Sequence, residues 1–106
     1  MKLQNTLRVL NVSQNGLSDS KLLYIAELVS LRVLDISHNE NITDEGIKYL
    51  KPLVSLEKLN MRKCDQLTGK CLIYMDDLTS LNGLNLDNSL MLIAKQRFDW
   101  KQKCFY

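Results

Sequence analysis

A nine-residue pattern recurs four times along the chain and constrains its fold more than any other feature. The copies read LRVLNVSQN, LRVLDISHN, LEKLNMRKC and LNGLNLDNS, and they begin at residues 7, 31, 56 and 81. Each copy has leucine at its first and fourth positions, an apolar residue at the sixth, and Asn, Cys or Ser at the ninth. Successive copies start 24, 25 and 25 residues apart, a period typical of solenoid proteins. One repeated structural unit therefore organises the chain.

Each repeat contains two different hydrophobic periods. Within the nine-residue pattern, apolar and other residues alternate, as they do in a strand with one buried face. After the pattern, apolar residues recur every three or four positions, which predicts an amphipathic helix. These helical residues are Leu22, Ile25 and Leu28, then Ile47, Leu50 and Leu53, then Leu72, Met75 and Leu78. Strands that alternate with helices predict a parallel sheet.

A hydroxyl residue stands just ahead of each predicted helix, at Ser18, Thr43 and Thr68. Side-chain oxygens at this position often accept hydrogen bonds from the first backbone N–H groups of a helix. We therefore expect these three side chains to cap their own helices. Asp44 and Glu45 follow Thr43 and favour the positive end of the helix dipole.

The repeated pattern resembles the LxxLxLxxN/C motif of the leucine-rich repeat family over residues 7–89. The repeat length and the segments ITDEGIKYL and CDQLTGKCL are most similar to the cysteine-containing subtype found in F-box substrate receptors. The resemblance implies an α/β solenoid, a horseshoe segment with a short parallel sheet on the concave side and helices on the convex side. We assign residues 1–89 to the repeats and residues 90–106 to a C-terminal cap or tail.

The concave face of the predicted sheet is the candidate binding surface, since this family usually binds protein ligands there. Its side chains alternate with the buried leucines and have no predicted place in the core. The predicted protein-binding residues are Val9, Asn11, Val33, Asp35, His38, Lys58, Asn60, Arg62, Lys63, Asn85 and Asp87. A solvated sheet face without a ligand is the alternative interpretation.

The third repeat contributes a modest basic patch to this face. Lys58, Arg62 and Lys63 lie close together in the pattern, and Arg32 is on the preceding strand. No aromatic residue is interleaved with them to stack on nucleic-acid bases. The formal net charge of +2 also gives little attraction to nucleic acid or to an anionic membrane. An acidic protein segment is therefore favoured over nucleic acid as a partner, and a merely solvated patch is favoured over both. No nucleic-acid or membrane partner is predicted.

The histidine and the cysteines form no recognisable catalytic or metal motif. The chain has one histidine, His38, and the spacing of Cys64 and Cys71 matches no common zinc site. A His–Cys nucleophilic pair would also need a third group and an oxyanion hole. The segment NENITDEGIKYL, which starts at Asn39, has neither the glycine nor the glutamate that a calcium loop needs at its sixth and twelfth positions. We predict no enzymatic activity, no metal and no cofactor.

The chain has three cysteines, which is a small and odd number and so predicts no disulfide framework. We therefore predict a reducing, cytoplasmic location.

The two ends depart from the repeat. Ahead of Leu7 the sequence offers no apolar cap, so we expect further repeats or a capping partner at the N-terminal edge. In the tail, we expect the apolar residues Leu92, Ile93, Phe98 and Trp100 to cover the last repeat. An amphipathic basic segment that docks on a partner or on a membrane surface is the alternative for the tail.

The function predicted from the sequence is a non-catalytic protein–protein interaction module that binds its partner through the concave sheet face. Two other interpretations stay open. The first is a substrate-recognition fragment of a ubiquitin-ligase receptor, which rests on the subtype resemblance. The second is a structural fragment of a longer repeat protein with no partner of its own.

Overall fold

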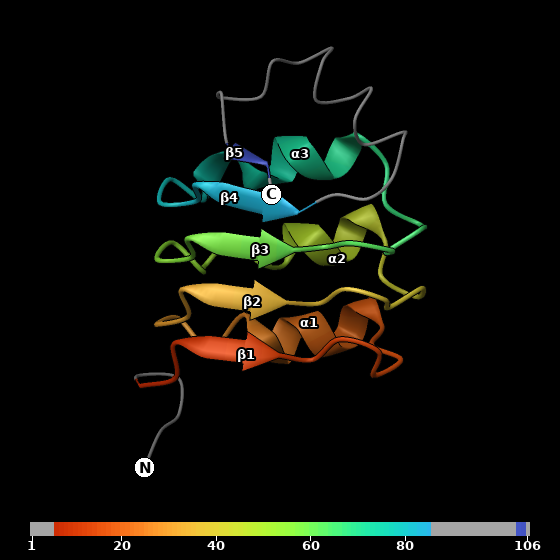
Figure 1. Cartoon of the computed structure of the whole chain (residues 1–106), viewed down its shortest axis with the longest axis horizontal. Coiled ribbons are helices and arrows are strands. Elements are labelled where there is room, and N and C mark those ends of the chain that lie inside the picture. Colours follow the sequence, from red (N-terminus) through yellow and green to blue (C-terminus); the bar gives the residue numbers. More distant parts are fainter. Residues whose placement is uncertain (1–5, 86–103, 106) are drawn as a thin grey trace.

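The computed structural model describes residues 6–85 and 104–105. Strands and helices alternate along the repeats, and the strands form one parallel sheet in the order β1-β2-β3-β4-β5 (Figure 1). The elements are β1 (Val9–Asn11), α1 (Asp19–Ile25), β2 (Val33–Asp35), α2 (Asp44–Lys48), β3 (Lys58–Asn60), α3 (Lys70–Tyr74), the 3-10 helix η2 (Met75–Asp77), β4 (Gly83–Asn85) and β5 (Cys104–Phe105). The predicted α/β repeat solenoid is confirmed.

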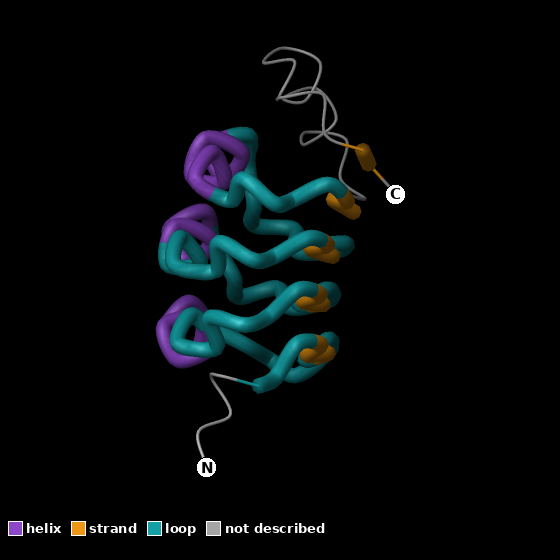
Figure 2. Tube along the Cα trace, turned by 90° about the vertical axis from the view of Figure 1, so that its left-hand side faces the viewer, coloured by secondary structure: helices purple, strands orange, loops and turns teal. Residues whose placement is uncertain are grey.

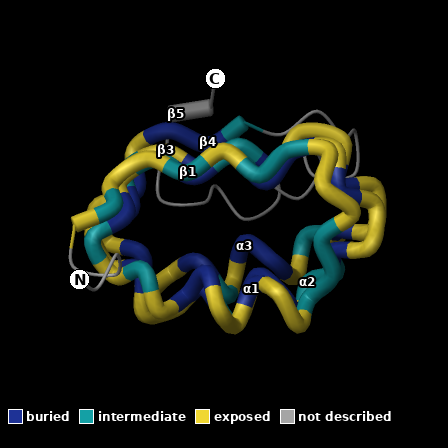
Figure 3. The backbone as a smooth tube through the Cα atoms, turned by 90° about the horizontal axis from the view of Figure 1, so that it is seen from below, coloured by how far each residue is buried: buried dark blue, intermediate teal, exposed yellow. Residues whose placement is uncertain are grey.

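The sheet and the helices form two layers (Figures 2 and 3). Buried leucines from both layers form one hydrophobic core. The central strand leucines of the repeats are register partners, and Leu34, Leu59 and Leu84 are each 0% exposed. From the helical layer, Leu22 and Leu72 face them and are also fully buried. Burial of one leucine side chain stabilises a fold by about 1.5–3 kcal/mol. Stacked units therefore share one continuous core, which a single unit of this size lacks.

A fifth strand at the C-terminal end of the sheet was not anticipated from the sequence. Cys104 pairs with Gly83, and Phe105 pairs with Leu84, both in parallel register. Two residues are too few to show an alternating pattern, so periodicity gives no signal there. The four tail residues predicted to cover the last repeat lie outside the described part of the chain. Strand β4 is therefore paired on both sides, by β3 and by β5.

Asn39 fixes the turn that follows β2 and joins it to the first repeat. Its side chain is fully buried, and Oδ1 accepts the backbone N–H groups of Asn15 and Leu17 at 3.1 and 3.0 Å. Its Nδ2 lies 3.1 Å from the carbonyl oxygen of Val12 and 2.9 Å from that of Ile36. One amide therefore satisfies the turns of two repeats.

Cys64 occupies the same position in the third repeat and makes fewer contacts. Its buried thiol donates a hydrogen bond to the carbonyl oxygen of Ile36 at 3.2 Å. This bond replaces the contact between Asn39 and Val12 one repeat earlier. Cysteine thus keeps the link to the preceding strand in a compact, mostly apolar side chain.

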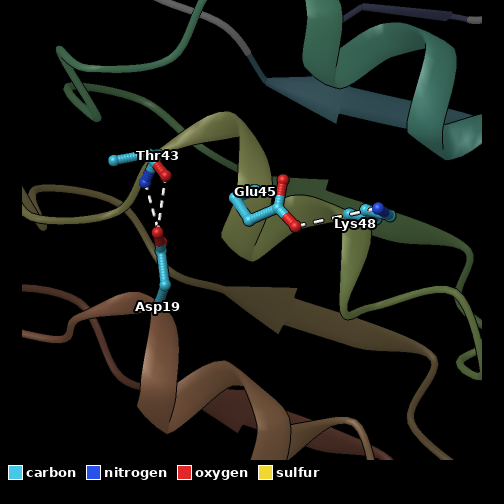
Figure 4. Close-up of polar contacts among 4 residues, drawn as sticks. All are labelled: Asp19, Thr43, Glu45 and Lys48. Carbon is cyan, nitrogen blue, oxygen red and sulfur yellow. Dashed lines mark hydrogen bonds and ion pairs between the residues drawn. The ribbon is translucent and has the colours of Figure 1, made fainter.

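The hydroxyl residues ahead of α1 and α2 do not cap these helices, so this prediction was wrong. Ser18 and Thr43 have the predicted N-cap backbone, but neither side chain bonds the N–H groups of its helix. The Thr43 hydroxyl instead donates to Asp19 of the preceding repeat (Figure 4). At α3, Gly69 is the N-cap, while the Thr68 oxygen accepts the Lys70 N–H at 3.3 Å. The bond that the hydroxyl donates to an ionised carboxylate is stronger than the neutral bond that it would accept as a helix cap, which explains why it turns away from the helix.

Two such links form what we call the Asp–Thr ladder, which consists of Asp19 with Thr43 and Asp44 with Thr68. Each threonine donates its backbone N–H to Oδ1 at 2.8 Å and its hydroxyl to Oδ2 at 2.5 Å. Hydrogen bonds to ionised groups contribute about 1.5–3 kcal/mol each. Gly69 stands where the next aspartate would be, so the third repeat offers no carboxylate for a further link.

Gly46 gives the first link of the Asp–Thr ladder, between Asp19 and Thr43, its room. A Cβ atom at Gly46 would lie 2.2 Å from Oδ1 of Asp19 and 2.8 Å from Cδ1 of Leu22. Real Cβ contacts are never this short, so a side chain at this position would displace the carboxylate. Glycine is therefore the residue that lets α2 approach α1 while Asp19 bonds Thr43.

We expect Gly46→Ala to lower the free energy of unfolding by about 1–3 kcal/mol, although alanine is the better helix former by about 1 kcal/mol. The urea midpoint, followed by circular dichroism, measures this change. The same substitution in an Asp19→Ala background should cost less, because the closest contact is gone. Equal costs in the two backgrounds would contradict the explanation.

We expect Asn39→Ala to cost about 3 kcal/mol or more, because several buried backbone groups lose their partner at once. Asn15→Ala is the matched control. The Asn15 side chain is exposed and donates one bond to the carbonyl of Ser13 at 2.9 Å, so its loss should cost less than about 1 kcal/mol. Urea unfolding of both variants tests the difference, and similar midpoints would show that Asn39 does not hold the turns.

Candidate functional site

The concave strand face places an apolar pair beside a cation. Val9, Val33 and Lys58 are register partners on β1, β2 and β3. Val9 is 62% exposed, Val33 is half-buried and Lys58 is exposed. Gly83 follows them on β4 and is buried. This row of register partners is therefore apolar on β1 and β2, basic on β3, and without a side chain on β4.

The next column of this face has a structural role that the sequence interpretation missed. Asn11, Asp35 and Asn60 each accept, through Oδ1, the backbone N–H two residues further on, at 3.0 Å. Asp35 also accepts the Ser37 hydroxyl at 2.6 Å, and Ser37 is buried. Such bonds turn the chain out of the strand. Three predicted binding residues thus end their strands, and ligand binding by them stays a prediction.

Basic side chains flank the apolar pair on both sides. Arg8 and Arg32 are exposed on the first two repeats, and Arg62 is exposed after β3. Arg32 pairs with Glu57 at 3.9 Å, with both side chains about half exposed. A surface pair of this kind contributes little and leaves Arg32 accessible to a ligand. The Lys58 ammonium donates to Oδ1 of Asn82 at 3.1 Å, which holds it above the sheet.

A shallow groove of about 440 Å³ lies beyond the carboxyl ends of the first three strands. Its lining residues come from three repeats and are Gln14, Gly16, His38, Glu40, Asn41, Lys63 and Asp65. Gln14, His38 and Lys63 have φ angles of 55°, 57° and 62°, in the left-handed region. This backbone conformation directs one side chain from each of three successive repeats toward the groove.

The structure unites some of the predicted site residues and separates others. His38 and Lys63 line the groove, while Asn85 is half-buried at the end of β4. Asp87 lies outside the described residues. The sequence interpretation missed the acidic members of the groove, Glu40 and Asp65. Only their position in the repeat could have indicated them, because each lies two residues after a residue with left-handed backbone.

The buried thiols are poor nucleophiles. Burial raises the pKa of Cys64 to about 11, although the backbone N–H of Asn39 opposes part of this effect. Burial also raises the pKa of Cys71, and the nearby Asp44 carboxylate adds to it. Both thiols are therefore protonated at neutral pH, and the thiolate is the reactive form. Within residues 6–85 and 104–105, no three His, Cys, Asp or Glu side chains gather as a metal site.

The thiol pKa values predict slow alkylation and a loss of stability in alkali. In a Cys104→Ser variant, iodoacetamide at pH 8 should modify the native chain at least about 100-fold more slowly than the urea-unfolded chain, because reaction requires opening of the core. A raised folded-state pKa contributes stability below the unfolded pKa of about 8.5. This contribution is lost as the pH rises through 8.5 toward 11.

Urea midpoints of the Cys104→Ser variant at pH 8 and pH 10 measure this loss. Adding Cys64→Ala and Cys71→Ala provides the control, since other groups also titrate in alkali. The triple variant should lose less stability between the two pH values. An equal loss would mean that the buried thiols do not cause it.

The parallel strands, the outer helices and the shared leucine core define the class of the molecule as a segment of an α/β repeat solenoid. Two stretches of the chain, residues 4–26 and 28–51, match the family model described as Leucine Rich repeat. These matches support a leucine-rich repeat family for this chain. No curated protein matches the chain.

Leucine-rich repeats are generally protein-interaction modules, and the family is typically non-enzymatic. The F-box subtype is not confirmed by these matches. Among the described helices, none has the length and apolarity to cross a bilayer.

Proposed function

We propose that the chain is a protein-interaction module that binds an acidic segment of a partner across the concave sheet face. The observation that carries this proposal is the row of Val9, Val33 and Lys58, in which an exposed apolar pair adjoins a cation in strand register. An apolar side chain of the partner would rest on the two valines. Carboxylates on either side of it would meet the basic residues.

The charges around the valines favour an acidic partner. Arg8 and Arg32 are exposed just ahead of β1 and β2, Lys58 is exposed on β3, and Arg62 follows β3. Glu57 offsets Arg32 only weakly, because both groups are exposed to solvent. Complementary charges of this kind raise the association rate and select the partner.

The shallow groove beyond the carboxyl ends of the first three strands, which we call the rim groove, extends the proposed surface. His38 and Lys63 lie at its rim beside the carboxylates of Glu40 and Asp65. Mixed charges suit the polar edge of an interface, which surrounds a more apolar centre. We therefore place the apolar anchor of the partner at the valines and its polar flank over the groove.

The same face would serve a substrate receptor of a ubiquitin ligase, the narrower alternative drawn from the subtype resemblance. No observation among the described residues favours that role over general protein binding. A structural role without a partner is the other alternative. It predicts that no peptide binds the concave face selectively.

A peptide-display selection against the immobilised chain tests the proposal. We expect enriched peptides to have an apolar residue flanked by Asp or Glu. Arg62→Glu with Lys63→Glu should weaken their binding about tenfold or more, measured by fluorescence anisotropy, and added salt should weaken binding to the parent chain.

Lys21→Glu with Lys70→Glu is the matched control, because it changes the net charge equally on the opposite, helical side. It should leave the dissociation constant nearly unchanged. Equal weakening by both double variants would show an effect of net charge alone. Unchanged binding by the concave-face variant, with native circular dichroism, would exclude this face.

A further inference from the structure

The first repeat has an incompletely covered side, which is distinct from the concave face. Five of its apolar core positions are half-buried, whereas the equivalent positions of the second and third repeats are at most 2% exposed. The half-buried residues are Leu7, Leu10, Val12, Leu17 and Leu28. These are the same positions that pack against the preceding unit in every later repeat.

Asn15 is exposed on this side of the first repeat, although its counterpart Asn39 is fully buried. Asn39 owes its burial to the first repeat, whose Val12 carbonyl and Leu17 N–H it bonds. Within the described residues, Asn15 makes only the local side-chain bond to the Ser13 carbonyl. The Asn15 amide is thus placed to bond the turn of a preceding unit, as the Asn39 amide bonds the turn of the first repeat.

Ser18 corresponds to Thr43, the hydroxyl residue of the Asp–Thr ladder. The two residues have nearly the same backbone angles, with φ and ψ of −115° and 172° at Ser18 and −114° and 175° at Thr43. The Ser18 hydroxyl lies 3.0 Å from the hydroxyl of Ser20. Thr43 bonds a carboxylate from the preceding unit, so Ser18 is placed to receive one in the same way.

Lys21 adds a matching charge beside Ser18. Its position corresponds to Gly46, which adjoins Asp19, and to Cys71, whose pKa is influenced by Asp44. The position is therefore next to the ladder carboxylate in both later repeats. In the first repeat it holds an exposed lysine, which would pair with an incoming carboxylate.

We propose that the uncovered side of the first repeat docks one further leucine-rich βα unit, whose first helical residue is aspartate. The half-buried leucines would pack on that unit, Asn15 would bond its turn, and Ser18 with Lys21 would bind its aspartate. The interface continues the one already made between the first and second repeats. This proposal does not depend on binding at the concave face.

A duplication within the full chain tests the proposal. A copy of residues 7–30, inserted between Thr6 and Leu7, places a second Asp19 ahead of Ser18. We expect this extended chain to unfold at a higher urea concentration than the parent chain. Changing only the inserted aspartate to alanine should raise the unfolding equilibrium constant about tenfold.

Ser18→Ala separates the proposed bond from general stacking. It should change the parent chain little and the extended chain about tenfold. With the inserted aspartate already replaced, it should have little further effect, because the two groups act as one pair. Additive effects would overturn the proposed bond, and an unchanged or lower urea midpoint on extension would overturn the docking surface.

Two other occupants give different results. If residues 1–5 of this chain cover the side, their deletion should lower the urea midpoint of the parent chain, and the proposal fails. If a second copy covers it, gel filtration should show a concentration-dependent dimer that a Leu10→Glu substitution abolishes, and the proposal also fails. A monomeric parent that is insensitive to the deletion supports the proposal.

Discussion

Burial of leucine side chains between successive βα units is the interaction on which the rest of this structure depends. Each of the first three units is a three-residue strand with a helix of five to seven residues, and neither element is stable alone. Stacking in register places Leu34 against Leu59, and Leu59 against Leu84, with no solvent between them. The polar links can form only because this packing fixes the distance between units. Asn39 and the Asp–Thr ladder then fix the register.

Much of the fold followed from the sequence because the repeat gives the same signal several times. The strand leucines lie where the pattern predicted. The helices are shorter than predicted, because Leu28, Leu50, Leu53 and Leu78 follow the helix ends. Leu50, Leu53 and Leu78 are nevertheless buried in the core. The roles of Thr43 and Gly46 did not follow, since both depend on a carboxylate that is 24 or more residues away in the chain. A pattern within one repeat contains no information about contacts between neighbours. Helix capping was the local explanation, and a contact between repeats replaced it.

The candidate site was predictable as a surface and less so as a set of roles. Alternation in the strands placed Val9, Val33 and Lys58 on the concave face. It could not show that Asn11, Asp35 and Asn60 bend the chain after each strand. The rim groove depends on left-handed backbone at residues other than glycine, which residue type does not indicate. Its acidic lining therefore became visible only in three dimensions.

The Asp–Thr ladder gives the solenoid a chemical polarity. The second repeat, which takes part in both links, presents a hydroxyl on one side and a carboxylate on the other, as Thr43 and Asp44 show. Units can therefore be joined head to tail, while a symmetric contact between two first repeats would bring the Ser18 and Lys21 side of both copies together, with no ladder carboxylate from either. Such a contact would lose each polar link and set like charges together. The two ends of the array are thus chemically different, and further units can stack on it in one orientation only.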